Sequence, residues 1–445
     1  MDIQERNIKI EVCRKFQCKH TAKAVCAAKV CVLFISFVLI SCSDKNTVQI
    51  WTDRPEFALY GEFFNNAQKQ YKVSVKYMEF PINGLNRANS PDIIIASWLK
   101  NSSTQTYFKN ISNIFGTKKL SRNIFYPRLL AAGRIDGRNQ YLLPVSFNVP
   151  ALIFSKEQES EISNQFTINF DEIKRISSEY NTEVNGSYTR MGFSPLWNSD
   201  FLFDIAMLRG ASFREDEPAQ GARTSARNPL VWDSPALERS MSFIHDWTNE
   251  INTSSRMDED FSFKYFSESK ERLIQSGRIL FSYIKSNQLF LIDDEVMPAL
   301  DFRWIMEQGM IPIAEDMIML GIPKWSNSQN AARAFIMWFF SAESQRQLLD
   351  YFRSNRLNEN IFGICGGFSA ISSVTEYVYP VFYPELLGRM PPSEYFMEPN
   401  ILPARWAAIK DRVILPYMSE RAGVENSGAI VPLERRITDW VRLNR

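Results

Sequence analysis

The amino-acid sequence predicts an α/β protein with more than one domain. Short apolar runs with the pattern of β-strands alternate along the chain with segments of helical periodicity, and this alternation is typical of α/β folds. The chain has 445 residues. Even without its first 41 residues, which we expect to be removed, it is longer than one compact core requires.

The first 41 residues have the features of an export signal. They carry seven Lys or Arg against three Asp or Glu, and they end in the apolar run Val30–Ser41. That run is shorter than the roughly 20 residues of a membrane-spanning helix, whereas a basic region before a short apolar one is typical of a secretory signal. The sequence LISC at its end resembles a bacterial lipoprotein signal, so we expect cleavage before Cys42 and lipid attachment to it. A plain secretory signal and a signal anchor are the alternatives.

Removal of this segment changes what the cysteines and charges imply. Five of the six cysteines lie at or before position 42, and only Cys365 follows, so no internal disulfide is expected. The run Cys13, Cys18, His20 and Cys26 has metal-ligand residue types but lies in the removed part, and we expect no metal and no cofactor. Without this segment 44 basic and 47 acidic residues are left of the 51 and 50 in the whole chain. This near-balance gives no reason to expect a nucleic-acid partner.

The first elements after the signal predict a β-α-β unit followed by another strand. Val48–Trp51 is a β-type run, and apolar side chains recur at helical spacing in Glu56–Tyr71. Val73–Met78 alternates as a second strand. Ile93–Ile95 is a short apolar run that suits a buried parallel strand.

The stretch Tyr141–Lys156 predicts a passage of the chain from one sheet to another. It is apolar and strand-like, but it contains Pro144 and Pro150, which a continuous central strand would exclude. Beyond it the pattern predicts helices over 169–180, 201–208, 235–249, 266–275, 331–352, 401–418 and 434–443, and strands over 278–283 and 317–323.

Six stretches in the same order resemble the extracellular solute-binding proteins of ABC importers, family 1, the group that includes the maltose-binding proteins. They are IWTDRPEFALYGEFFN, SPDIIIASW, LPVSFNVPALIFSK, MGFSPLWNSDFLFDIAMLRGASF, SGRILFSYIKSN and GIPKWSNSQNAARAFIMWFFSAESQRQLL. No single stretch is specific, but together they span nearly all of the chain after the signal. The resemblance implies a two-lobed periplasmic-binding-protein-like fold of type II, with lobes joined by hinge crossover segments and the ligand between them.

This fold implies that each lobe is built from two separate segments. With the signal at 1–41, we expect the first lobe to take residues 42–148 and 291–345. The second lobe then takes 149–290 and 346–445. In open α/β sheets ligands bind beyond the carboxyl ends of the strands, and lobe interfaces are favoured sites for pockets.

The stretch IWTDRPEF, at the first strand-to-helix junction, has two compatible interpretations. Asp53 precedes Glu56 by three residues, as in a capping box, and Pro55 suits the first turn of a helix. The resemblance implies that the same junction faces the cleft. Trp51 and Asp53 are therefore also candidate ligand contacts.

The resemblance implies five further candidates, four of them within the six stretches and the fifth in ARWAAIKDRVI near the end of the chain. Sugars present C–H faces that aromatic rings cover and hydroxyl groups that polar side chains bind. The candidates are Trp98, Asn148, Trp197, Asn287 and Trp406. Some relatives carry a carboxylate at the position of Asn148, and some stack a ring on sugar at that of Trp406. For each tryptophan, packing in the core is the alternative role.

The expected function is capture and delivery of a ligand rather than catalysis. We expect a small polar solute, with carbohydrate as the preferred class, to be bound in the cleft and passed to the permease subunits of an ABC importer. The protein would be an exported monomer, anchored by lipid on Cys42 to the cell membrane and facing the periplasm or the cell exterior.

Catalysis has little support in the sequence. After the signal there is one histidine, His245, and the chain has no G-x-S-x-G, H-E-x-x-H or P-loop motif. Paired carboxylates for glycan cleavage need not be adjacent in sequence. An exported glycan-processing enzyme is therefore kept as an alternative, as is a diverged binding protein that acts as a surface adhesin or sensor.

Overall fold

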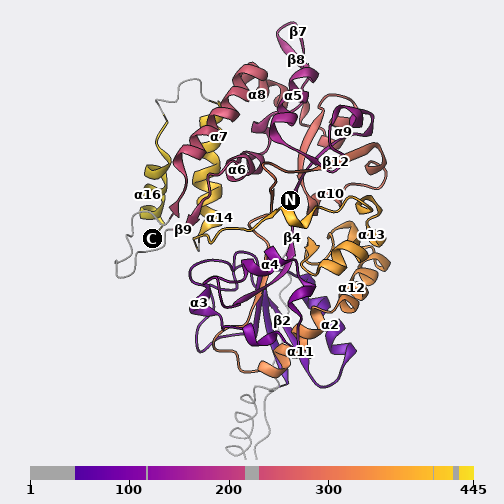
Figure 1. Cartoon of the computed structure of the whole chain (residues 1–445), viewed down its shortest axis with the longest axis vertical. Coiled ribbons are helices and arrows are strands. Elements are labelled where there is room, and N and C mark those ends of the chain that lie inside the picture. The colour runs from indigo at the N-terminus through magenta and orange to yellow at the C-terminus, as the bar shows by residue number, and fades with distance from the viewer. Residues whose placement is uncertain (1–45, 117–118, 216–229, 404, 424–429, 445) are drawn as a thin grey trace, which may run out of the picture. The chain divides into compact units, whose positions relative to one another are not determined.

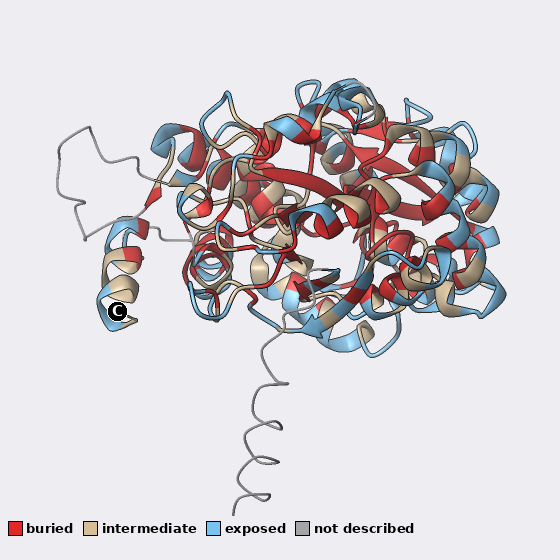
Figure 2. Ribbon diagram, turned by 90° about the horizontal axis from the view of Figure 1, so that it is seen from below, coloured by how far each residue is buried: buried red, intermediate tan, exposed pale blue. Residues whose placement is uncertain are grey.

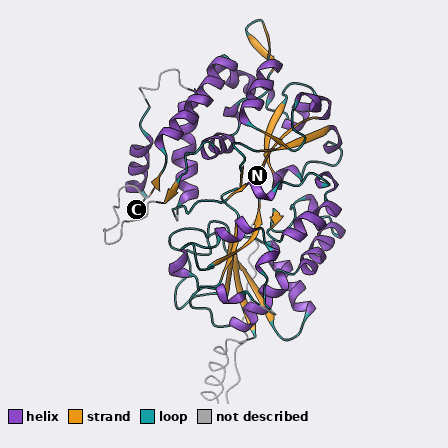
Figure 3. Cartoon of the chain, viewed as in Figure 1, coloured by secondary structure: helices purple, strands orange, loops and turns teal. Residues whose placement is uncertain are grey.

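The computed structural model describes residues 46–445 apart from 117–118, 216–229, 404, 424–429 and 445. The predicted signal, residues 1–41, and Cys42 lie outside the described residues. Within the described part, the chain is divided between two main β-sheets, each covered by helices (Figures 1 and 3). We call the part around the six-stranded sheet lobe 1 and the part around the four-stranded sheet lobe 2.

The sheet of lobe 1 begins with the predicted β-α-β unit. β1 pairs in parallel with β2 and with β3, and every residue of β3 is buried, as the Ile93–Ile95 run predicted. β14 runs antiparallel to β3 and to β4. In sheet order the strands are β15 (Phe368–Ser369), β4 (Leu142–Phe147), β14 (Ile318–Gly321), β3 (Ile93–Ala96), β1 (Thr47–Thr52) and β2 (Lys72–Tyr77).

The sheet of lobe 2 is mainly antiparallel. β5 lies between β11 and β12 and runs antiparallel to both, while β12 pairs in parallel with β6. In sheet order the strands are β11 (Phe281–Lys285), β5 (Pro150–Ser155), β12 (Leu300–Ile305) and β6 (Thr167–Ile168).

The two prolines of the predicted passage lie where the ladders tolerate them. Pro144 is in β4, where the pairing with β14 shifts register between Ile318 and Met319. Pro150 is the first residue of β5. Prolines are found at bulges and at strand starts because they cannot donate to the ladder. The chain therefore leaves lobe 1 after Phe147 and enters lobe 2 at Pro150.

The later passages lie elsewhere than predicted. β12 pairs with β5, so the chain returns to lobe 1 between β12 and β14 rather than at residue 291. The strand is hard to recognise in the sequence because it carries Asp301 and Arg303, which are buried as a pair. The second boundary, at residue 346, is also wrong, because the ring of Phe352 packs against Tyr60 of lobe 1 and β15 pairs with β4.

Helices of lobe 1 surround its sheet. They are α2 (Glu56–Ala67), α3 (Thr104–Tyr107), α4 (Pro127–Ala132), α11 (Gln329–Phe339), α12 (Ala342–Ser354) and α13 (Tyr379–Phe382). The single helix predicted over 331–352 is two helices, because Ser341 takes an extended conformation between α11 and α12.

Helices of lobe 2 come from the middle and the end of the chain. They are α5 (Phe170–Tyr180), α6 (Ser199–Leu208), α7 (Ser234–Asp246), α8 (Ser255–Tyr265), α9 (Lys270–Gln275), α10 (Ser286–Leu289), α14 (Trp406–Ile409), α15 (Leu415–Gly423) and α16 (Leu433–Leu443). The short π-helical segment η11 (Lys410–Ile414) continues α14 into α15. The predicted helix over 401–418 therefore begins only at Trp406.

Three pairs of short strands complete the described chain. They are β7 (Thr182–Val184) with β8 (Ser187–Arg190), β9 (Arg214–Glu215) with β10 (Leu230–Val231), and β13 (Ile311–Pro312) with β16 (Phe396–Met397). The strands of both main sheets are largely buried (Figure 2). Among the described residues, no helix is both long enough and apolar enough to cross a membrane.

Candidate functional site

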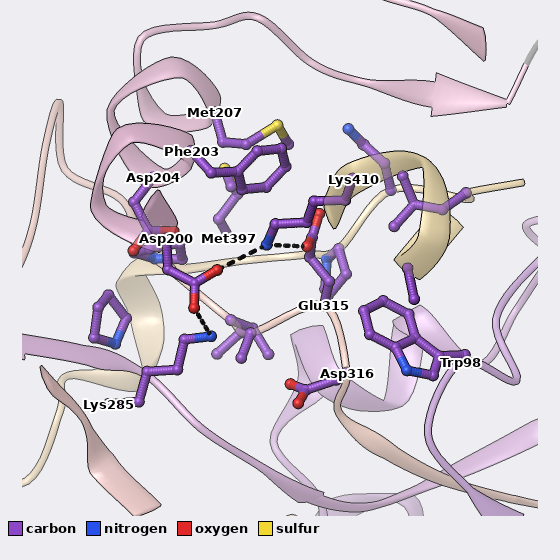
Figure 4. Close-up of a pocket in the computed structure, with 18 of the residues that line it drawn as sticks. Trp98, Asp200, Phe203, Asp204, Met207, Lys285, Glu315, Asp316, Met397 and Lys410 are labelled. Atoms are coloured by element: carbon purple, nitrogen blue, oxygen red, sulfur yellow. Dashed lines mark hydrogen bonds and ion pairs between the residues drawn. The ribbon is translucent and has the colours of Figure 1, made fainter. Parts of the chain in front are cut away.

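A cavity of about 190 Å³ lies where the two lobes meet, and we call it the small cavity. α6, the end of β11 and η11 of lobe 2 line it, together with the connection between β13 and β14 (Figure 4). Lobe 1 contributes Trp98, which follows the carboxyl end of β3. This is the edge of an α/β sheet at which ligands bind.

A wider hollow of about 670 Å³ adjoins the small cavity and shares Trp98, Glu315 and Asp411 with it. Apolar and aromatic side chains form much of its wall, with a few charged groups between them. Those on the wall include Phe80, Lys100, Met317, Met319, Arg405, Trp406, Arg412 and Trp440. Small-molecule sites typically combine such a wall with a few placed polar groups.

Two lysines hold two acids in the small cavity. Lys410 Nζ lies 2.7 Å from the Glu315 carboxylate and 3.2 Å from that of Asp200, and Lys285 Nζ lies 2.7 Å from Asp200. Burial alone would lower the pKa of Lys410, but the two acids outweigh it and raise that pKa. Burial also tends to raise the pKa of Asp200, yet the two lysines hold it below its ordinary value. The ion pairs connect the four groups in a row, in the order Lys285, Asp200, Lys410 and Glu315.

Two further acids in the small cavity are not paired with a cation. The Tyr283 hydroxyl donates a hydrogen bond of 2.8 Å to Asp204. Burial raises the pKa of Asp204 to about 7, although Lys285 and the Tyr283 hydroxyl act against it. Asp316 makes no hydrogen bond or ion pair within the described chain. Asp316 is partly exposed, and its charge acts on nearby Lys285 without a direct ion pair.

Trp98 stands at the junction of the hollows with a strained backbone. Its φ is +60°, in the left-handed region that bulky side chains rarely adopt. A residue held there costs on the order of 1–3 kcal/mol, and such strain is concentrated at functional sites. The side chain lines the small cavity, the wider hollow and a third hollow of about 200 Å³ beside Asp53. Its position makes Trp98 the lobe 1 residue best placed to contact a ligand.

Comparison with known proteins identifies the fold of this chain. No protein-family model and no curated protein sequence matches the chain. Among solved structures, an ABC substrate-binding protein from Listeria monocytogenes in complex with cycloalternan matches with a TM-score of 0.58. It is 15% identical, and the match covers 90% of this chain and 99% of that one. The chain has the fold of ABC substrate-binding proteins.

Two more solved structures share this substrate-binding fold. The cyclic α-maltosyl-1,6-maltose binding protein from Arthrobacter globiformis matches with a TM-score of 0.56 at 15% identity, over 90% of this chain and 99% of that one. An extracellular solute-binding protein from Staphylococcus aureus in complex with maltose matches with a TM-score of 0.55 at 14% identity, over 90% and 96%. The two-lobed α/β fold predicted from the sequence is confirmed.

Of the two candidates at the first strand-to-helix junction, Asp53 lines a hollow and Trp51 does not. Trp51 lies in β1, 3% exposed, with Lys76 Nζ 5.1 Å from its ring centre, and it lines none of the three hollows. Asp53 lines the third hollow, where its carboxylate accepts hydrogen bonds from the Ser97 amide and hydroxyl. The predicted capping box is wrong, because Pro55 is the N-cap of α2 and no side chain caps it. Asp53 instead ties β1 to the segment after β3.

Asn148 lies at the hinge, with both ends of its amide in use. Its Nδ2 donates to the Gly366 carbonyl at 3.0 Å, and its Oδ1 accepts from the Ser286 hydroxyl at 2.7 Å. Its backbone carbonyl accepts from the Ala314 amide at 2.9 Å. Asn148 therefore connects three other segments near the passages between the lobes, and its side chain is committed to the protein.

Trp197 and Asn287 lie in lobe 2, away from the small cavity and the wider hollow. The Trp197 ring stacks on Phe261 with the ring centres 5.7 Å apart and meets Phe266 edge-on. Asn287 is in α10, next to the hinge residue Ser286, and its Oδ1 is buried without a partner. Trp197 has the packing role that was its alternative in the sequence, and the structure gives no account of the unpartnered Asn287 oxygen.

Trp406 lines the wider hollow but is only 1% exposed. Its indole N–H donates to the Glu315 carboxylate at 3.0 Å, and its ring packs against Phe203 and Phe213. Trp406 therefore forms part of the wall of the wider hollow, and its hydrogen bond positions Glu315.

Sequence reasoning missed every charged residue of the small cavity. The missed residues are Asp200, Asp204, Lys285, Glu315, Asp316, Lys410 and Asp411. Asp200 and Asp204 are four residues apart in α6, which puts them on one face, although the predicted helix began only at Phe201. That spacing is common on solvated helices, so it was no signal without the tertiary structure.

Proposed function

We propose that this protein is an exported receptor that binds a small polar solute between its lobes, with carbohydrate as the ligand class. The single observation that carries the proposal is the small cavity. Lobe 1, lobe 2 and the connection between them all line it, and two of its acids, Asp204 and Asp316, form no ion pair within the described chain. Such a site gains contacts when the lobes close, so ligand binding shifts the protein toward the closed state.

A saccharide fits the chemistry of the two adjoining hollows. Trp98, Phe203 and Met397 supply apolar surface for sugar C–H faces, and Asp204, Asp316 and Asn400 supply partners for hydroxyl groups. The proteins of the same fold described above were solved with saccharides or named for binding them, which supports the same ligand class here.

Delivery to an importer and a lipid anchor belong to the same proposal. The fold is that of ABC substrate-binding proteins, which supports permease subunits as partners. The LISC sequence before the body of the protein supports lipid on Cys42 and a position at the outer face of the cell membrane. Chemical labelling with a fatty-acid analogue tests the anchor, with Cys42→Ala as the variant that should stay unlabelled.

A thermal-shift screen against sugars, polyols, amino acids and polyamines tests the binding function. A ligand present at 100 times its Kd adds about 2.7 kcal/mol of apparent stability. For the ligand found, Trp98→Ala should weaken binding at least tenfold, which is about 1.4 kcal/mol. The matched control is Trp338→Ala in α11, whose ring packs on Phe64 and Phe335 away from the cleft. Equal affinity of the Trp98 variant and the wild type would show that Trp98 does not contact the ligand.

One observation favours a second candidate, a glycan hydrolase. Asp204, with its pKa raised to about 7, and Asp200, with its pKa lowered, lie on the same helix in the small cavity. Carboxyl groups whose pKa values are driven apart are typical of a general acid with an ionised partner. Two lysines hold Asp200, however, and this favours binding over catalysis. Release of product from an oligosaccharide on long incubation, abolished in Asp204→Asn, would establish the hydrolase instead.

A further inference from the structure

Basic side chains gather at one edge of the lobe 1 sheet. β1, β2 and β3 are parallel, and β4 is parallel to them because β14 runs antiparallel to both β3 and β4. The amino-terminal ends of these four strands therefore lie opposite the edge where Trp98 faces the cleft, at the lower end of lobe 1 in Figure 1. We call the following Lys and Arg side chains the basic edge: Lys69, Lys72, Lys109, Lys119, Arg122, Arg134, Arg138 and Lys324.

Five members of the basic edge adjoin the ends of strands. Lys72 is the first residue of β2, and Lys69 lies three residues before it. Arg134 and Arg138 lie in the connection from α4 to β4. Lys324 lies three residues after β14, whose carboxyl end meets this edge because β14 runs opposite to its neighbours. Four of these five side chains are exposed, and Arg134 is partly exposed.

Hydrogen bonds bring Lys109 and Lys119 to the same edge. Lys109 Nζ donates to the Ser326 carbonyl at 3.2 Å, in the connection that follows β14. A hydrogen bond of 2.9 Å joins η1 (Ser112–Ile114) to the connection before β4. Lys119 Nζ donates to the carbonyl of Asn113 in η1, also at 2.9 Å. Both lysines therefore lie beside the strand ends that carry the first five members.

The last member, Arg122, lies near Arg134. Its guanidinium is 4.1 Å from the centre of the Phe115 ring. Its pKa is lowered, first by burial and then by the positive charge of Arg134. Arg134 Nε is itself buried without a hydrogen-bond partner. The two cations are thus close enough to repel each other.

Few acids oppose the basic edge. None of its eight members forms an ion pair with another described residue. Asp92, whose charge acts on Lys109, is buried and accepts four hydrogen bonds from the protein. Asp136 is exposed, and residues 138–141 supply its hydrogen bonds. Eight basic groups therefore stand against two acids, one of them buried.

The chain enters the fold at the basic edge. β1 begins at Thr47, which lies opposite Lys72 in the register of β1 and β2. Cys42, the predicted site of lipid attachment, precedes Thr47 by five residues in the sequence, and five residues span at most roughly 18 Å. A lipid on Cys42 would therefore hold the basic edge beside the membrane.

We propose that the basic edge binds the anionic lipid head groups of the membrane in which the protein is anchored. This inference rests on the lipid anchor of the proposed function and adds an electrostatic contact to it. The negative charge of a membrane surface attracts nearby Lys and Arg side chains, and each contributes about fivefold to the affinity. Trp325, next to Lys324, is partly exposed, and tryptophan is enriched at the boundary between membrane and water.

This contact would set the orientation of lobe 1. An anchor at a single point does not fix an orientation, whereas charges spread along the starts of several strands hold that edge toward the membrane. The opposite edge of the sheet, with Trp98 and the cleft, then points away from the membrane and stays accessible to a solute. A soluble polyanion would match the charge as well, but the position of the basic edge beside the chain entry favours the membrane.

Vesicle sedimentation tests the contact separately from the anchor. The protein is purified without its predicted signal and with Cys42→Ala, so that no lipid is attached. Its binding is measured to vesicles of phosphatidylcholine alone and to vesicles with about one third phosphatidylglycerol. We expect at least tenfold tighter binding to the anionic vesicles at 0.1 M salt. The preference should disappear at 1 M salt, because the Debye length falls from about 10 Å to about 3 Å.

Two variants that each lose four positive charges assign the binding to the basic edge. The edge variant combines Lys69→Gln, Lys72→Gln, Arg138→Gln and Lys324→Gln. The matched control replaces four exposed side chains of α7, α8 and α9 in lobe 2, with Arg239→Gln, Arg256→Gln, Lys264→Gln and Arg272→Gln. We expect the edge variant to lose at least tenfold in affinity for the anionic vesicles and the control less than threefold. Both should keep the wild-type melting temperature, because the replaced side chains are exposed.

Three results would overturn the inference. They are equal binding of the wild type to both kinds of vesicle, equal losses in the two variants, and binding to soluble polyphosphate without binding to vesicles. The proposed function has separate readouts, which are fatty-acid labelling of Cys42 and the thermal shift with a solute. The edge variant should leave that thermal shift unchanged, because the basic edge lies opposite the cleft. Failure of the membrane contact is therefore distinguishable from failure of the receptor function.

Discussion

At the hinge, both ends of the Asn148 amide are hydrogen-bonded within the protein, whereas in the small cavity Asp204 accepts one hydrogen bond and Asp316 none. Both regions lie at passages between the lobes, and both are rich in polar side chains. The difference is that the hinge uses its polar groups to join chain segments, while two acids of the cavity form no ion pair within the described chain.

Hydrogen bonds and ion pairs within the protein distinguish the structural polar groups of this fold from the candidate ligand-binding ones. A buried polar group without a partner costs about 1–3 kcal/mol, whereas Asp316 is partly exposed and water can hydrate it. The ion pairs of Lys410 show that the same cavity also contains satisfied groups. Removing a satisfied group should therefore reduce stability, and removing an unsatisfied one should reduce only binding.

The largest effect is expected for Lys410→Met. The change leaves Glu315 and Asp200 with one fewer partner each in a buried site, and loss of one member of a buried pair costs about 3–5 kcal/mol. Chemical denaturation measures the free energy of unfolding. Arg421→Met is the control, because its pair with half-exposed Glu238 should contribute less than about 1 kcal/mol. Equal losses in the two variants would mean that the Lys410 network is not structural.

Asn148→Ala tests the hinge itself. It removes the bonds to the Gly366 carbonyl and the Ser286 hydroxyl, and we expect a loss of about 1–3 kcal/mol in the free energy of unfolding. Asn89→Ala, on an exposed loop, should change it by less than about 0.5 kcal/mol. If the variant has normal stability but binds ligand weakly, Asn148 is a ligand contact rather than a structural residue of the hinge.

The buried carboxyl of Asp258 in lobe 2 should make the free energy of unfolding depend on pH. Asp258 is buried, bonded by Ser194 through one oxygen and unpartnered at the other. Burial raises its pKa to about 7, against the effect of the hydrogen bond from Ser194 and of nearby Asn252. Because the folded state holds the proton that the unfolded state releases, this carboxyl contributes stability at low pH and loses it as pH rises toward 7.

Asp258→Asn should therefore gain stability relative to the wild type as pH rises. The gain is at most about 1.4 kcal/mol per pH unit between pH 5 and 7, and it levels off above that range. Denaturation of both proteins at pH 5, 6, 7 and 8 measures it. Asp260→Asn, exposed on the same helix, should show no such trend. A pH-independent difference for Asp258→Asn would place its pKa outside this range.

The smallest effect on stability is expected for Asp316→Asn. Because Asp316 makes no hydrogen bond or ion pair in the described chain and is partly exposed, its change should alter the free energy of unfolding by less than about 0.5 kcal/mol. Thermal unfolding without ligand measures this. A loss above 2 kcal/mol would show that Asp316 is a structural residue and would end the distinction between the hinge and the cavity.

Much of the fold was predictable because local patterns agree with the tertiary structure. The apolar run Ile93–Ile95 is a fully buried strand, and the two prolines of Tyr141–Lys156 mark a real passage between sheets. Predictions failed where a charged pair is buried, as in β12, and where a short break divides a helical pattern, as at Ser341. β12 pairs with β5, which lies far back along the chain, and the break between α11 and α12 is the single residue Ser341.

The candidate site was less predictable than the fold. Of the seven residues proposed as ligand contacts, Trp98 and Trp406 line the wider hollow and Asp53 lines the third one. Tryptophans attract attention in a sequence, yet Trp51 and Trp197 pack inside the protein because large apolar rings are stabilised there. The acids of the small cavity resemble ordinary surface charges when they are seen one at a time.

The sequence by itself determined the α/β alternation, the first passage between the lobes and the residues from which a site can be built. These depend on neighbours within a few residues, so the chain records them directly. Only the tertiary structure decided which polar groups are satisfied. Asp200 meets Lys410 and Glu315 meets Trp406 only after distant segments converge on one cavity. Their partners are a property of three-dimensional packing, which no local sequence pattern records.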